Sequence, residues 1–155
     1  MEFLLSVDLG IRTGLAMFGS DQKLYWFRSQ NFGSSARLRR AIPWLLNQEE
    51  DLAYVIIEGG GPLLKIWDAE LQRRNLEVIK IMADNWRSEL LYYREQQNRS
   101  DAKSNAIIYA GKVIEKLSDH KATSLDNNAA EAILIGLYGM QRLNWIRSAG
   151  QYMRK

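Results

Sequence analysis

The stretch that most constrains the fold is the apolar run AYVII at residues 53–57, which ends at Glu58 and is followed by three glycines. Strands with one solvent-facing side alternate apolar and polar residues, whereas strands covered on both faces are apolar throughout. Residues 3–8, FLLSVD, form a second run of this kind and end at Asp8. Strands covered on both faces need helices on both sides of the sheet, so the chain is predicted to be an α/β protein.

The order of the predicted elements narrows the type of sheet. The first three strands are joined by short turns, which is typical of an antiparallel meander, and helices then alternate with strands. This order is similar to that of ribonuclease H-like proteins and predicts a five-stranded mixed sheet flanked by helices. The predicted elements are strands 3–8, 13–18 and 24–30, a helix capped by Ser34 or Ser35, strand 53–57, helix 63–74, strand 77–81, and helices at 86–93, from a cap at Asp101 to about Lys116, and at 127–146.

Length and composition exclude several classes of protein. The chain has 155 residues, which suits a single domain spanning residues 1–155. It contains no cysteine, so disulfides and thiolate metal sites are excluded. The N-terminus lacks a basic leader, and no apolar stretch approaches the roughly 20 residues that span a bilayer. We therefore expect no membrane partner, and a location in the cytoplasm or an equivalent organellar or viral compartment.

The distribution of basic residues is more informative than the formal net charge of +3. Lys and Arg gathered on one surface neutralise phosphates, which favours a nucleic-acid partner. Solvated helix faces produce the same pattern, so charge alone leaves both interpretations open. The two groups of basic residues are Arg37, Arg39 and Arg40, and Arg87, Arg94, Arg99 and Lys103.

Asp8 and Glu58 occupy equivalent positions, each at the end of a predicted buried strand and before a glycine turn. A carboxylate is costly to bury unless a metal ion or a basic group compensates its charge. In α/β sheets, ligands gather at the carboxyl ends of strands. The two strands are neighbours in the expected fold, so the carboxylates are predicted to face one another. The alternatives are a turn-bonding role for Asp8 and simple surface exposure for Glu58.

The segment SLDNNAAEAILIG at residues 124–136 contains two further acids, Asp126 and Glu131. Asp126 and Glu131 are five residues apart, which corresponds to about 140° around an ideal helix. Both side chains therefore approach one site only if Asp126 lies at the non-helical cap. Capping alone would also explain Asp126. Glu131 lies in an otherwise apolar stretch, which favours a functional role over exposure.

Carboxylates from separate strands and a helix suit cations that prefer oxygen ligands. Mg²⁺ is expected, with Mn²⁺ as a substitute. Two such ions about 3.5–4 Å apart can activate a water and stabilise the leaving oxygen in phosphodiester hydrolysis. This chemistry requires no histidine, and His120 lies in a polar loop as a predicted bystander.

Several segments, in order, resemble the motifs of RuvC-type Holliday junction resolvases, a branch of the ribonuclease H-like nucleases. VDLGIRTGLAMF resembles the first motif, VIIEGG the second and NNAAEAILIG the last. Asn85-Trp86-Arg87 and Asp101-Ala102-Lys103 resemble the Trp-Lys and downstream Lys features of chloroplast, phage and poxvirus relatives. The resemblance spans roughly residues 3–142 and implies a metal-dependent endonuclease that cuts four-way DNA junctions.

The resemblance also assigns roles to single residues. It implies that the metal binds Asp8, Glu58 and Glu131, and that Lys103 contacts the scissile phosphate. It further implies a homodimer. PLLKIWDAELQ at residues 62–72 offers an interface because its apolar residues exceed one helix face, although packing on the sheet would explain them equally.

The last motif departs from the family's pattern. The family usually carries a further acid three or four residues before the position of Glu131, where this chain has Asn128 and Asn127. The nearest acid is Asp126. Either Asp126 serves as the fourth metal ligand through a shifted helix cap, or the site works with fewer acids or at reduced activity.

Three other functions compete with junction cleavage. A nuclease of the same superfamily that trims structured RNA would have almost the same active site. A nuclease-derived module that binds branched nucleic acid without cutting it would accommodate the asparagines of the last motif. DLGIRTGLA also resembles the phosphate-binding hairpin of the sugar kinase, actin and Hsp70 class, but those proteins need two such domains and this chain has room for one.

Overall fold

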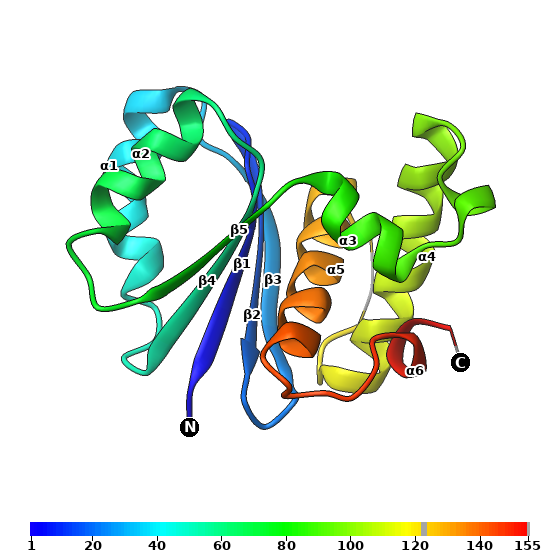
Figure 1. Cartoon of the computed structure of the whole chain (residues 1–155). Coiled ribbons are helices and arrows are strands. Elements are labelled where there is room, and N and C mark those ends of the chain that lie inside the picture. The colour runs from blue at the N-terminus through cyan, green and yellow to red at the C-terminus, as the bar shows by residue number, and fades with distance from the viewer. Residues whose placement is uncertain (122–123, 155) are drawn as a thin grey trace.

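The computed structural model describes residues 1–121 and 124–154. Five strands form one sheet in the order β3-β2-β1-β4-β5, with helices on both faces (Figure 1). The predicted α/β class and five-stranded mixed sheet are confirmed, and the arrangement is compatible with the ribonuclease H-like fold. The strands are β1 Phe3–Asp8, β2 Arg12–Gly19, β3 Leu24–Asn31, β4 Leu52–Glu58 and β5 Glu77–Ile81.

Strand β1 lies at the centre of the sheet and determines which strand ends meet. It pairs antiparallel with β2 and parallel with β4. In this register Asp8 lies opposite Gly14 on one side and Glu58 on the other. The carboxyl ends of β1 and β4 therefore present two acids side by side, as the sequence predicted.

The helices divide between the two faces of the sheet (Figure 1). Helices α1 and α2 cover one face and enclose one apolar core. Helix α5 lies directly on the other face, against β1 and β2, and α4 packs on the outer side of α5. The helices are α1 Ser35–Leu46, α2 Pro62–Leu71, α3 Ala83–Leu90, α4 Arg99–Leu117, α5 Asn127–Arg142 and α6 Gly150–Met153, with a 3₁₀ turn η1 at Tyr93–Glu95.

Helix α5 approaches the sheet closely because glycines lie at its contacts. A Cβ atom at Gly14 of β2 would overlap the carbonyl oxygen of Asn128, and one at Gly136 would overlap the ring of Phe18. The hydroxyl of Ser6 donates to the carbonyl of Ala132 at 2.6 Å. Residues 129–140 of α5 are all buried, so this helix brings its side chains against the sheet.

Several predicted helix boundaries differ from the structure. Helix α4 begins at Arg99, and its cap is Asn98, whose side-chain oxygen accepts a hydrogen bond from the amide of Asp101. Asp101 therefore lies in the first turn and is not the cap. Helix α5 ends at Arg142, four residues before the predicted end at residue 146.

Helix α2 packs on the sheet, which was the alternative to a dimer interface. Trp67 and Leu71 are buried, and Leu63, Leu64 and Ile66 pack partly buried against the same core. Its excess of apolar residues is thus explained within one chain and is no evidence for an interface. Among the described residues, no helix is long and apolar enough to cross a membrane.

Candidate metal centre

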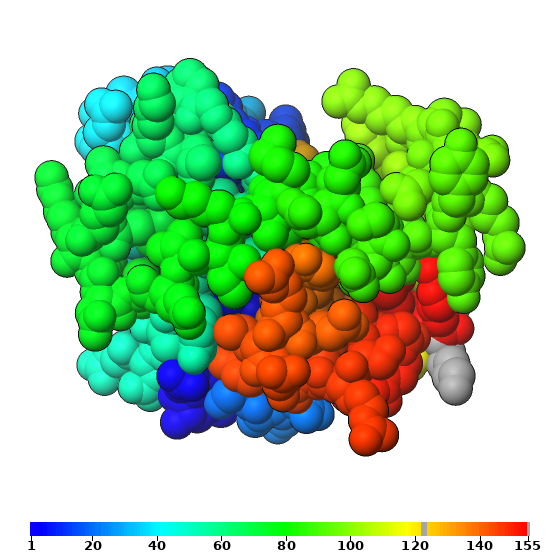
Figure 2. All heavy atoms as spheres, in the orientation of Figure 1, coloured from blue at the N-terminus to red at the C-terminus, as the bar shows by residue number. Residues whose placement is uncertain are grey.

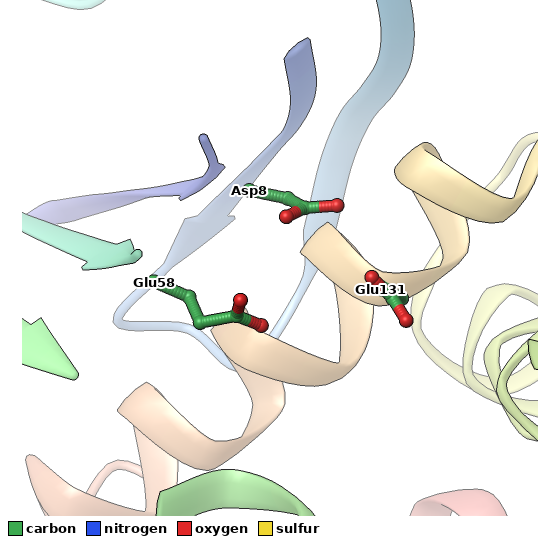
Figure 3. A group of neighbouring side chains, drawn as sticks. All are labelled: Asp8, Glu58 and Glu131. Atoms are coloured by element: carbon green, nitrogen blue, oxygen red, sulfur yellow. The ribbon is translucent and has the colours of Figure 1, made fainter. Parts of the chain in front are cut away.

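Three acids from separate elements converge at one end of the sheet. Asp8 ends β1, Glu58 ends β4, and Glu131 lies in the second turn of α5. One carboxylate oxygen from each lies within 4.8 Å of the other two. Figure 3 shows Asp8 and Glu58 extending from neighbouring strand ends toward the helix that carries Glu131. Asp8 and Glu131 are only 9% and 8% exposed, so the three charges share a site that water reaches poorly.

Helix α3 supplies hydrogen-bond donors to two of these acids. The indole Nε1 of Trp86, a fully buried residue, donates to Glu58 Oε2 at 2.7 Å. Arg87 Nη2 donates to Glu131 Oε1 at 2.8 Å. The Arg87 guanidinium also lies 5.2 Å from the Trp86 ring centroid. The side chain of Arg87, one of the basic residues grouped in the sequence, therefore points to the acidic cluster.

The proximity of the acids alters their protonation. Burial, followed by the charges of Glu131 and Glu58, raises the pKa of Asp8 from 3.8 to about 8, although Arg87 opposes the shift. Burial likewise raises the pKa of Glu58, against the hydrogen bond from Trp86. Neighbouring carboxylates with raised pKa values are typical of sites built for a cation or for acid–base chemistry.

The donor set fits a divalent cation that prefers oxygen. All three candidate ligands are carboxylates on separate, well-packed elements, which is the ligand type that Mg²⁺ and Mn²⁺ prefer. The cluster already draws in a guanidinium, which shows that a positive charge is favoured there. Asp8, Glu58 and Glu131 are therefore the residues that could hold a metal ion.

The structure does not bring Asp126 into this cluster. Asp126 is the N-cap of α5, and its Oδ1 accepts a hydrogen bond from the amide of Asn128 at 2.7 Å. It borders a separate groove of about 310 Å³ that Arg12 and Phe27 also line. Capping, the simpler of the two predicted roles, accounts for this residue.

Lys103 and His120 lie outside the cluster. Lys103 is exposed in the second turn of α4, and its backbone carbonyl accepts a hydrogen bond from Asn127 Nδ2 at 3.3 Å. It thus borders the start of α5, the helix that carries Glu131. The ring of His120 packs edge-on against Phe27, with 6.4 Å between centroids, which agrees with a bystander role.

The cap assignment predicts that Asp126→Asn is nearly silent, because asparagine caps helices as well as aspartate does. Asp126→Ala should lower the free energy of unfolding by about 1 kcal/mol. Urea denaturation measures the stability of both variants, and cleavage rates at a series of Mg²⁺ concentrations test the metal site. A raised Mg²⁺ midpoint in Asp126→Asn would instead identify Asp126 as a ligand.

The raised pKa of Asp8 predicts that the metal-free protein loses stability as the pH rises. Because the pKa is 3.8 in the reference state and about 8 in the folded protein, the folded state binds more protons across that window. The free energy of unfolding must then fall with increasing pH. Urea denaturation in EDTA at pH values from about 5 to about 8 measures this slope. Asp8→Asn should flatten it, and an unchanged slope in that variant would contradict the assignment.

Comparison with known proteins assigns no family to this chain. No protein-family model matches it, and no curated protein matches it.

Proposed function

We propose that this protein is a metal-dependent endonuclease that cleaves phosphodiester bonds in branched DNA, with the four-way junction as its substrate. The observation that carries the proposal is the convergence of Asp8, Glu58 and Glu131 within 4.8 Å at the carboxyl ends of β1 and β4. Ligands of α/β sheets gather at this edge. Carboxylate clusters of this kind hold Mg²⁺ in phosphodiester-cleaving enzymes.

The residues around the cluster have defined parts in such a reaction. Bound Mg²⁺ would supply Lewis-acid stabilisation of the charge that develops on the phosphate. Trp86 keeps the Glu58 carboxylate oriented, and Arg87 does the same for Glu131. Removing a hydrogen bond of this type to a metal ligand typically lowers metal affinity or activity by about 10- to 100-fold.

The loop after Glu58 leaves room for a sugar–phosphate backbone. Gly59 and Gly61 have φ values of 125° and 78°, which side chains other than glycine rarely adopt. A Cβ atom at Gly60 or Gly61 would meet nothing within 4 Å. The loop is thus bare and open directly beside a candidate metal ligand.

Exposed basic residues flank the same end of the sheet. The first turns of α1 lie at this end (Figure 1), and the start of α4 projects from the molecule on the other side (Figure 2). Such an arrangement suits the phosphates of nucleic-acid arms on both sides of the cluster. The exposed basic residues are Arg37, Arg39 and Arg40 on α1, and Arg94, Arg99 and Lys103 at η1 and α4.

An open four-way junction exposes the faces of the base pairs at its branch point, which an uninterrupted duplex keeps stacked. Tyr93, beside the start of α4, is 82% exposed, whereas the ring of Tyr92 already has the Arg154 guanidinium 4.0 Å from its centroid. Exposed aromatic rings near basic residues are platforms on which unpaired bases stack. This favours a branched substrate over an uninterrupted duplex.

Paired cutting of a junction needs two active sites, and each chain has one candidate cluster among its described residues. The proposal therefore includes a homodimer, whose two-fold symmetry would match that of the junction. Sedimentation of the protein with a junction tests this part separately. A strictly monomeric complex would contradict paired incision by one dimer.

Incubation with a labelled synthetic four-way junction, with and without Mg²⁺, tests the proposal. The expected result is Mg²⁺-dependent incision of the junction and little cutting of linear duplex. Glu115→Gln, which changes an exposed acid on α4, is the matched control and should cut normally. Preferential cutting of a structured RNA would overturn the DNA assignment, and tight junction binding with no product in Mg²⁺ or Mn²⁺ would overturn cleavage.

A further inference from the structure

Arg87 places a permanent positive charge inside the acidic cluster. Its guanidinium donates to Glu131 at 2.8 Å, and the two side chains are 28% and 11% exposed. A guanidinium does not lose its proton in proteins. The metal-free cluster of three carboxylates and one guanidinium therefore carries a net charge of −2 when the acids are ionised.

We propose that the centre binds one divalent cation and that Arg87 supplies the positive charge a second cation would otherwise bring. This inference rests on the proposed metal centre and specifies how many ions it takes. The net charge of −2 matches one divalent cation. Two divalent cations beside Arg87 would give the cluster a net charge of +2 before any substrate phosphate binds.

The local structure holds Arg87 in this position. Trp86, the preceding residue, is fully buried and is tied to Glu58 at 2.7 Å. The start of α3 is fixed by Asn85, whose side chain accepts from the amide of Met82 at 2.7 Å. The Nε atom of Arg87 is also buried and has no hydrogen-bond partner among the described residues.

The start of α5 supplies no fourth acid to the cluster among the described residues. Positions 127 and 128 at the start of α5 are asparagines, which are neutral. Asp126 is directed to the helix cap by its bond to the amide of Asn128. With three acids instead of four, the balance of charge that would support two divalent ions is missing, and an arginine is present within hydrogen-bond distance of one of the ligands.

A titration of the metal-free protein with Mn²⁺, followed by electron paramagnetic resonance of the unbound ion, counts the sites without any nuclease assay. We expect one bound Mn²⁺ per chain. The spectrum of the bound Mn²⁺ should show no spin coupling between neighbouring ions. Two ions per chain would overturn the inference and leave the metal centre standing. No binding at all would overturn the metal centre itself.

Variants of Arg87 test its part in the count. Arg87→Gln keeps a donor for Glu131 but removes the charge, so it should bind the first Mn²⁺ about tenfold more tightly and admit a second. Arg87→Lys keeps the charge and should still bind one. Arg94→Gln changes an exposed arginine outside the cluster and is the matched control. If folded Arg87→Gln binds Mn²⁺ with the affinity and stoichiometry of the wild type, the inference is overturned. If Arg87→Gln does not fold, binding of two Mn²⁺ ions by Arg87→Lys would overturn it.

Discussion

Asp8→Asn and Glu58→Gln are each expected to reduce junction cleavage by about 10³-fold or more. Metal ions contribute several kcal/mol of transition-state stabilisation, and each 1.36 kcal/mol corresponds to a factor of about ten in rate. The amides keep the shape of the side chains but remove the charge that holds the cation. Because burial, and after it the charges of Glu131 and Glu58, disfavours the ionised form of Asp8 in the metal-free protein, Asp8→Asn should also raise the free energy of unfolding by roughly 1–2 kcal/mol.

Single-turnover rates on a labelled junction measure the loss, and urea denaturation in EDTA measures the gain in stability. Junction binding should survive, since contacts from Lys and Arg to phosphates supply most of the affinity. Glu131→Gln should be as impaired as the other two variants, because Glu131 lies in the same cluster. Wild-type cleavage by purified Asp8→Asn would refute the proposed centre.

Gly14→Ala is expected to lower the free energy of unfolding by about 3 kcal/mol or more, at the upper end of the usual cost of overpacking. The added methyl group would overlap the carbonyl oxygen of Asn128 and would also lie 3.2 Å from the Cβ of Asp8. The backbone carbonyl cannot rotate away as a flexible side chain can, so α5 must move off the sheet. Glu131 would move with it, and the cluster should bind Mn²⁺ less tightly.

The matched control is Gly111→Ala on α4, where an added Cβ meets nothing within 4 Å. That change should stabilise the helix by up to about 1 kcal/mol. Urea denaturation and Mn²⁺ titration of the two variants provide both readouts. Equal stability and equal Mn²⁺ affinity in Gly14→Ala and the wild type would show that the close approach of α5 to β2 is not required.

The sequence by itself determined the sheet and indicated Asp8, Glu58 and Glu131 as candidate ligands. The apolar runs that end at Asp8 and Glu58 identify strands covered on both faces, and this pattern is local because it depends on the two-residue period of a strand. The helix cap at Asp126 was also predictable, since a cap depends on residues within one turn. Parallel pairing of the two strands then places their carboxyl-terminal acids together.

Only the tertiary structure decided what surrounds those acids. Arg87 and Glu131 are 44 residues apart, and their contact depends on how α3 and α5 pack on the same face of the sheet. Asp126 and Glu131 belong to one short motif, yet packing directs Glu131 to the cluster, whereas Asp126 bonds to its own helix. Periodicity and capping depend on residues within a few positions of each other, whereas the distance between side chains on separate elements depends on how closely those elements pack. Here α5 packs closely on β2 because Gly14 has no side chain.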